Sequence, residues 1–228
     1  MTAMSNPLDR PIWHALAGRQ AAFAIGTDRA RRFVGEVGVF AATRDDAPES
    51  LNDLAELVRT HGPIGLLQVG EIPVPPGTTA QATMLGVQMV ARKIVPLDPA
   101  PPVERLTAAD APAMLALATA TQPGPFFART HELGTFWGVK VDGRPVAMAG
   151  ERMKLPGYTE VSGVCTDPAH RGKSYAALLS RTVATQIMAR GETPMLHAYA
   201  SNAPAIRLYE QLGFELRTHV NVMILRPA

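Results

Sequence analysis

The sequence is poor in three features that define large classes of protein: cysteine, net charge and long apolar runs. Its single cysteine, Cys165, excludes an internal disulfide and a cysteine-rich metal site. The formal net charge is only +2 over 228 residues, and neither half of the chain has a clear excess of one sign. This balance argues against nucleic acid or a membrane surface as the main partner. No apolar run approaches the roughly 20 residues needed to span a bilayer.

Signals for secretion and for metal binding are also missing. The N-terminal stretch MTAMSNPLDRPIW has no basic region followed by an apolar one, so we expect a soluble cytosolic protein. A single cysteine fits such a reducing compartment. The six histidines show no metal-ligand spacing such as H-E-x-x-H, and we therefore expect no metal ion.

The composition that remains is that of a folded protein with a sizeable core. Apolar residues make up 46% of the chain and charged residues 18%, which argues against disorder. The clearest break is IVPLDPAPP at residues 94–102, where four prolines in nine residues favour extended backbone. We place a boundary there, which divides the chain into residues 1–98 and 103–228.

Hydrophobic periodicity predicts an α/β fold, and the signals are sharper after this boundary. Asp142-Gly143 marks a hairpin within residues 135–153, and Thr107 with Asp110 resembles a capping box that opens a helix. Strands are predicted at residues 35–43, 63–70, 103–106, 158–166, 194–200 and 214–225. Helices are predicted at residues 49–62, 174–191 and 202–213, and residues 82–91 fit either type.

A short basic loop between a strand and a helix carries the most specific signal. In VCTDPAHRGKSYAALL, residues 164–179, Arg171 and Lys173 flank Gly172, and Ser174 precedes the helix. The N–H groups and the dipole at a helix N-terminus favour an anion, and a glycine lets the backbone approach a phosphate closely. The spacings of a P-loop and of a dinucleotide fingerprint are both absent. We interpret the loop as a diphosphate cradle, with a solvated basic turn as the alternative.

Two stretches resemble the acetyl-CoA-binding segments of the GNAT superfamily of N-acetyltransferases. That family's motif is Arg or Gln, two residues, Gly, one residue, then Gly or Ala. Arg171 and Ala176 match its ends, and Ser174 stands where the family usually has Gly. The second stretch, HAYASNAPAIRLYEQLGF at residues 197–214, resembles the family's later strand and helix with their Asn, Tyr and Gly-Phe. The likeness covers residues 135–225.

This resemblance implies a fold, a cofactor and a substrate class. The fold is a mixed, mostly antiparallel central sheet with a splayed pair of parallel strands, flanked by helices. Acetyl-CoA would donate an acetyl group to a primary amine of a small molecule or peptide. Residues 1–98 would be a degenerate copy of the same fold, with a plain stabilising extension as the alternative. The residues expected to bind the cofactor are Val164, Cys165, Thr166, Arg171, Gly172, Lys173, Ser174, Tyr175, Ala176, Asn202 and Tyr209.

Three side chains are candidates for catalysis. The resemblance implies that Tyr209, seven residues after Asn202, protonates the departing thiolate of coenzyme A. Glu151 and Glu160 are candidates for the base that takes a proton from the amine. An ordinary ion pair is the alternative for each of them, and a water relay is the alternative for both.

Alternation along the strand at residues 158–166 predicts which side chains share a face. One face would hold Glu160, Ser162, Val164 and Thr166, and the other would hold Thr159, Val161, Gly163 and Cys165. Cys165 is expected to pack as a small hydrophobe, because no His or acid stands near it in an arrangement that would activate a nucleophile.

Two interpretations of the whole chain stay open. The first is an acetyl-CoA-dependent N-acyltransferase that acts by direct attack of the amine on the thioester. The second is a non-catalytic acyl-CoA-binding or regulatory module that has kept the cradle. The sequence does not identify the amine, and it leaves a homodimer open.

Overall fold

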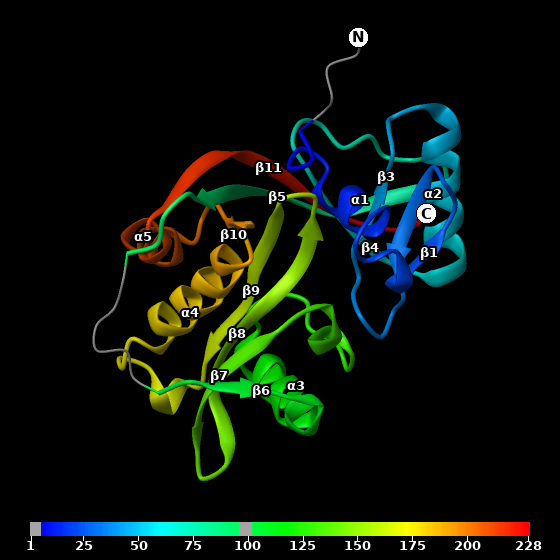
Figure 1. Ribbon diagram of the computed structural model, residues 1–228. Coiled ribbons are helices and arrows are strands. Elements are labelled where there is room, and N and C mark those ends of the chain that lie inside the picture. Colours follow the sequence, from blue (N-terminus) through cyan, green and yellow to red (C-terminus); the bar gives the residue numbers. More distant parts are fainter. Residues whose placement is uncertain (1–5, 96–101) are drawn as a thin grey trace.

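A large sheet organises the protein, which a computed structural model describes at residues 6–95 and 102–228 (Figure 1). Its strands are, in chain order, β4 (Ile64–Gln68), β5 (Thr78–Ala91), β6 (Glu104–Leu106), β7 (Phe136–Val141), β8 (Arg144–Leu155), β9 (Tyr158–Thr166), β10 (Thr193–Tyr199) and β11 (Phe214–Pro227). They lie in the order β4-β11-β5-β10-β9-β8-β7-β6, and every neighbouring pair except β9 and β10 is antiparallel. The predicted mixed, mostly antiparallel sheet is confirmed.

The parallel strands β9 and β10 pair over a short distance and then separate. Their pairing is limited to residues 158–160 against residues 193–195. Beyond this point β9 stays paired with β8 as far as Thr166, and β10 stays paired with β5 as far as Tyr199. The two strands therefore form a V that opens toward their carboxyl ends, as predicted. Main-chain groups on the inner edges of the V have no strand partner among the described residues.

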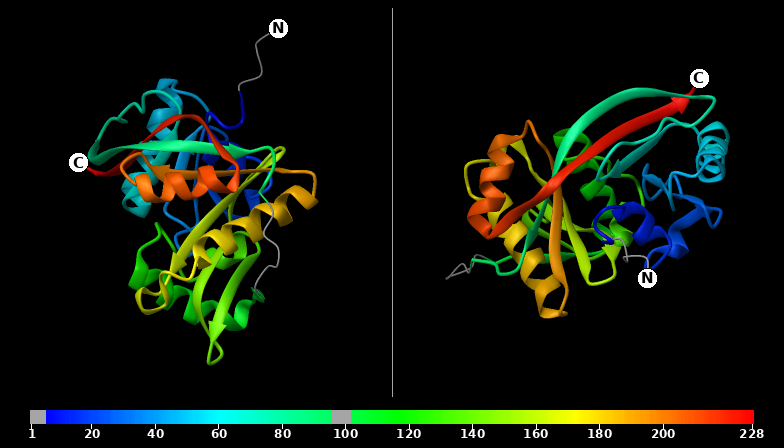
Figure 2. Two further views of the ribbon diagram at one scale, coloured as in Figure 1. Left: turned by 90° about the vertical axis from the view of Figure 1, so that its left-hand side faces the viewer. Right: turned by 90° about the horizontal axis from the view of Figure 1, so that it is seen from above.

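Helices cover both faces of this sheet (Figure 2). Helices α4 (Tyr175–Ala189) and α5 (Ala203–Leu212) lie on one face, and α3 (Ala111–Thr121) lies on the other. Alternation along β8 shows this directly, since Ala147 and Ala149 belong to the buried cluster under α4, whereas Met148 packs under α3. The predicted capping box of Thr107 and Asp110 is present at the short turn that leads into α3. The 3-10 turns within residues 102–228 are η2 (Ala108–Asp110), η3 (Thr130–Leu133) and η4 (Pro168–His170).

The N-terminal part adds a second, three-stranded sheet. It consists of β1 (Ala24–Gly26), β2 (Ala30–Phe33) and β3 (Ala41–Thr43), accompanied by α1 (Pro11–Leu16), η1 (Ala21–Phe23) and α2 (Pro48–His61). The strand predicted at residues 35–43 is shorter than expected. Residues 35–37 form a turn instead, because the Val37 N–H bonds to the Val34 carbonyl at 2.9 Å.

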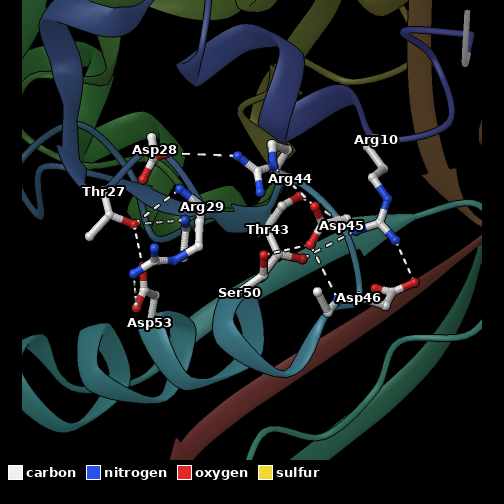
Figure 3. A network of polar contacts seen from close by, with 12 residues as sticks. Arg10, Thr27, Asp28, Arg29, Thr43, Arg44, Asp45, Asp46, Ser50 and Asp53 are labelled. Atoms are coloured by element: carbon white, nitrogen blue, oxygen red, sulfur yellow. Dashed lines mark hydrogen bonds and ion pairs between the residues drawn. The ribbon is translucent and has the colours of Figure 1, made fainter.

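Polar contacts fasten α2 to the loops of this small sheet (Figure 3). Arg29 Nε donates to the Asp53 carboxylate of α2 at 2.9 Å, and Thr27 Oγ1 donates to the same carboxylate at 2.6 Å. Ser50 Oγ donates to Asp45 Oδ1 at 2.5 Å, which holds the first turn of α2 to the loop before it. These contacts connect both the first turn and the middle of α2 to loops next to it and so orient the helix.

The predicted division of the chain does not coincide with a boundary in the large sheet. β4 and β5 come from the N-terminal side of that division, yet β5 lies between β10 and β11. Val87 and Met89 of β5 belong to the same buried cluster as the apolar side chains of α4. The proline-rich stretch at residues 94–102 falls largely on residues 96–101, outside the described ranges. A degenerate copy of the fold in residues 1–98 stays a prediction.

A bulge at Gly163 changes which side chains of β9 share a face. Pairing with β8 jumps from Ser162 to Cys165, and Gly163 has a φ of 63°. Val161 and Val164 both pack against the cluster under α4, whereas Cys165 packs on the α3 side. The strict alternation predicted for this strand is therefore wrong beyond Ser162, because the bulge inserts one extra residue.

Gly163→Ala is predicted to destabilise the protein more than the matched control Gly157→Ala. Both glycines have a left-handed φ, 63° and 76°, in which alanine is strained by roughly 1 kcal/mol. An added Cβ at Gly163 would lie 3.0 Å from Phe136 Cε1, whereas nothing lies within 4 Å at Gly157. In urea denaturation we expect the free energy of unfolding to fall by about 1 kcal/mol in the control and by about 2 kcal/mol or more in Gly163→Ala. Equal losses would mean that Phe136 does not restrict the bulge.

Candidate functional site

A cavity of about 570 Å³ lies at the open end of the V, between the end of β9 and the start of α4. Every residue predicted to bind the cofactor lines it, except Tyr209. The predicted residues that line it are Val164, Cys165, Thr166, Arg171, Gly172, Lys173, Ser174, Tyr175, Ala176 and Asn202. Sequence reasoning missed His170, Thr121, Gln122 and Pro123. The last three come from the end of α3, far away in the chain, and no local pattern marks them.

The cradle at the start of α4 is positive and rich in N–H groups. Gly172 and Ser174 have left-handed backbone, with φ of 78° and 56°, which turns the chain from the loop into the helix. The first N–H groups of a helix have no intrahelical acceptor, and the helix dipole places partial positive charge there. Arg171 and Lys173 are exposed beside them. This arrangement suits a diphosphate.

Two buried polar atoms in the cavity wall have no hydrogen-bond partner among the described residues. They are Thr166 Oγ1 and His170 Nδ1, and the latter lies 3.6 Å from the Asp167 carboxylate, beyond hydrogen-bond distance. Buried polar atoms in native proteins are nearly always hydrogen-bonded, so these two atoms are exceptions. The positive helix start and the β9 edge without a strand partner fit the diphosphate and the amide groups of acetyl-CoA.

Ser174 shows why the GNAT motif usually has glycine at this position. Its left-handed φ costs a residue with a Cβ roughly 1–2 kcal/mol, and its side chain makes no capping hydrogen bond in return. We predict that Ser174→Gly raises the free energy of unfolding by up to about 1 kcal/mol and does not weaken acetyl-CoA binding. Ser201→Gly, in a turn without a left-handed φ, is the control and should lose stability in the same thermal melts. A loss of stability in both variants would contradict the prediction.

Helix α5 presents two of the predicted residues in different ways. Asn202 is its N-cap, with Oδ1 accepting the N–H of Ala205 at 3.2 Å. Tyr209 lies deeper, in edge-to-face contact with Phe214, with ring centroids 6.0 Å apart. Burial raises the pKa of Tyr209 to about 12, so its hydroxyl is protonated at neutral pH.

Cys165 packs as a small hydrophobic side chain, as expected. It is 7% exposed and lies in the cluster under α3 with Met114 and Met148. Burial raises the pKa of its thiol to about 11, against the opposing effect of a hydrogen bond with Thr121. The thiol is therefore protonated at neutral pH, whereas a nucleophile needs the thiolate.

Glu160 is completely buried and fully hydrogen-bonded at the point where the V opens. Arg152 donates Nε and Nη2 to its two oxygens, each at 2.7 Å, and the Met153 N–H lies 3.3 Å from Oε2. His197 Nδ1 lies 2.7 Å from Oε1. Burial raises the pKa of Glu160, but the charge and the hydrogen bonds of Arg152 outweigh it, so that the pKa lies at about 2. A carboxylate held in this way is a poor proton acceptor.

Glu151 lies away from the cavity. Its Oε1 accepts Arg190 Nη2 at 2.8 Å, and its Oε2 lies 3.0 Å from Lys154 Nζ. Arg190 directly follows the fifteen residues of α4, so the carboxylate lies near the helix end opposite the cradle, about 22 Å along its axis. The structure brings Glu160 to the V but not Glu151. Both carboxylates form ion pairs, which was the alternative to a catalytic role for each of them.

Two further features of the described residues bear on function. Within residues 6–95 and 102–228, no three or more His, Cys, Asp or Glu side chains are grouped so as to hold a metal ion. None of the helices in these ranges combines the length and the apolar character that crossing a membrane requires.

Comparisons with known proteins point to one family. The family described as FR47-like protein matches residues 138–223. A proposed acetyltransferase of the GNAT family from Novosphingobium aromaticivorans is 43% identical over 98% of this chain and 100% of its own, with a TM-score of 0.91. A GCN5-related N-acetyltransferase from Kribbella flavida is 18% identical over 96% of this chain and 95% of its own, with a TM-score of 0.66, which shows a shared fold alone. No functionally curated protein matches the chain.

Proposed function

Since the chain belongs to the GNAT family of acetyltransferases, we propose that it transfers an acetyl group from acetyl-CoA to a primary amine of a small molecule or peptide. The observation that carries the proposal is the cavity at the open end of the V, which combines a positive cradle with main-chain groups of β9 that have no partner on β10. Acetyl as the acyl group, the amine as acceptor and a cytosolic location all belong to this proposal.

The cofactor would be held by main-chain groups from two segments. N–H groups of residues 171–176 would bind the diphosphate, and Arg171 and Lys173 would add attraction at longer range. Main-chain groups of residues 164–166, which lack a strand partner on the β10 side, would pair with the amides of the pantetheine arm. Acetyl-CoA then supplies the acetyl group as a thioester, and the amine takes that group as the thiolate leaves.

Tyr209 would provide the proton that the departing thiolate needs. Its hydroxyl stays protonated to a pH of about 12, and it is carried by the helix that follows the open end of β10. A proton donor placed within hydrogen-bond reach of a leaving group accelerates a reaction by about 10²–10⁴-fold.

The proton of the substrate ammonium group would pass to water. Glu160 is committed to Arg152 and His197, and Glu151 is held at the far end of α4. The pKa of Glu160, about 2, is too low for a general base near neutral pH, and Glu151 lies too far from the cavity to reach a substrate there. We therefore prefer the water relay to both carboxylates.

The proposed function is tested by binding and by thiol release. Acetyl-CoA should raise the melting temperature of the protein, and a panel of primary amines and peptides should include acceptors that cause release of free thiol. Stabilisation by acetyl-CoA without thiol release on any amine would favour the non-catalytic acyl-CoA-binding module instead. Absence of stabilisation would contradict both functions.

Tyr209→Phe is predicted to lower kcat by at least about tenfold while leaving the Kd for acetyl-CoA within twofold, because only the proton donor is removed. Tyr158→Phe is the matched control, since Tyr158 lies at the closed end of the V and packs against the N-terminal cluster. The control should keep wild-type turnover. Equal turnover in Tyr209→Phe and wild type would remove Tyr209 from the mechanism.

A further inference from the structure

A row of polar side chains crosses five neighbouring strands on the sheet face opposite α4. This polar row consists of Arg152 (β8), Glu160 (β9), His197 (β10), Gln88 (β5) and Arg217 (β11). Each member contacts the next, at 2.7 Å, 2.7 Å, 2.9 Å and 2.8 Å in that order. The contacts are therefore continuous from one strand to the next across the middle of the sheet.

The N-terminal segment closes one end of the polar row. Gln88 Nε2 donates to the Leu8 carbonyl at 2.9 Å, and Arg217 Nη2 pairs with the Asp9 carboxylate at 2.6 Å. Gln88 is completely buried, so no water competes for its own hydrogen bonds. Its orientation is consequently fixed by groups on both sides.

This fixed orientation determines which nitrogen of His197 carries the proton. Arginine only donates, so Gln88 Oε1 must accept from Arg217, and Gln88 Nε2 must donate to Leu8 and to His197 Nε2. His197 Nε2 is then an acceptor without a proton. In the neutral ring the proton is on Nδ1, which donates to Glu160 at 2.7 Å.

The contact between Glu160 and His197 lies where main-chain pairing stops. Glu160 and Met195 form the last residue pair of β9 and β10, and His197 lies two residues farther along β10. The side chains thus join the two strands beyond their last main-chain pair. The His197 side chain is 5% exposed and that of Glu160 is 0% exposed, so the contact is dry.

We propose that Glu160 is a positioning residue whose contact with His197 sets how far β9 and β10 separate. Gln88 holds His197 in the tautomer that makes this contact, with the proton on Nδ1. The inference rests on the proposed function, since the width of the V affects turnover only if the pantetheine arm lies in it. A carboxylate with four donors around it performs this role without changing its protonation state.

The first test compares Glu160→Gln with Glu192→Gln by calorimetry with coenzyme A and by steady-state kinetics. In Glu160→Gln the side-chain NH2 group faces an N–H donor of Arg152 or His197. Two donors cannot form a hydrogen bond, so the contact that links β9 to its neighbours should weaken. We expect the Kd for coenzyme A to rise at least about threefold and kcat to fall by less than a hundredfold. A Kd within twofold of wild type, or a fall in kcat of a hundredfold or more as for a lost base, overturns the proposal.

Glu192→Gln controls for the loss of a partly buried ion pair next to the same two strands. Glu192 directly precedes β10 at the closed end of the V, where its side chain is 15% exposed and pairs with Arg19 at 2.9 Å. It should keep a wild-type Kd for coenzyme A. A rise equal to that in Glu160→Gln would mean general loosening and would also overturn the proposal.

The second test needs neither turnover nor a folded Glu160 variant. The imidazole ¹⁵N and ¹H signals of wild-type His197, assigned by their loss in His197→Gln, should show the proton on Nδ1 at neutral pH. A proton on Nε2 overturns the proposal. If wild-type protein neither binds acetyl-CoA nor releases thiol, the proposed function has failed, whereas this measurement still decides the geometry of the polar row.

Discussion

The separation of β9 and β10 after three residue pairs is the constraint on which the site depends. A strand that loses a partner exposes a line of main-chain donors and acceptors, which must be bonded elsewhere. Here each strand keeps a complete neighbour on its outer side, β8 for one and β5 for the other, so the V stays ordered while its inner edges stay available. The sheet therefore supplies binding groups from its backbone, and the side chains around them are free to vary.

Charge is distributed differently on the two sides of this opening. The cradle carries exposed cations and helix N–H groups, which attract an anion from solution. The centre of the polar row is buried, where Arg152 pairs with Glu160, and at its end Arg217 pairs with the more exposed Asp9. Paired charges produce little field at a distance, and their hydrogen bonds are directional at close range. The cradle thus attracts an anion, whereas the polar row acts on the width of the V.

Local patterns predicted the elements that depend on neighbours in sequence. The Asp142-Gly143 turn, the capping box at Thr107 and the basic loop before α4 all involve residues within a few positions of one another, and the structure has each of them. The bulge at Gly163 escaped prediction, because a lone glycine in a strand does not tell a bulge from a weak strand position. The polar row escaped it as well, because its contacts join residues as far apart as Asp9 and Arg217, whose pairing no single-sequence periodicity encodes.

The place of β5 has a consequence for how the chain is made. This strand ends at Ala91, but both of its neighbours, β10 and β11, lie between residues 193 and 227. At a synthesis rate of about 5–20 residues per second, β5 would wait on the order of 10–30 s at the ribosome before its last partner is complete. During that time it exposes two unpaired edges and the apolar face that later lies under α4. Assembly of the sheet thus depends on long-range contacts that form last. Such contacts slow folding, and the edges of β5 need protection from aggregation until they form.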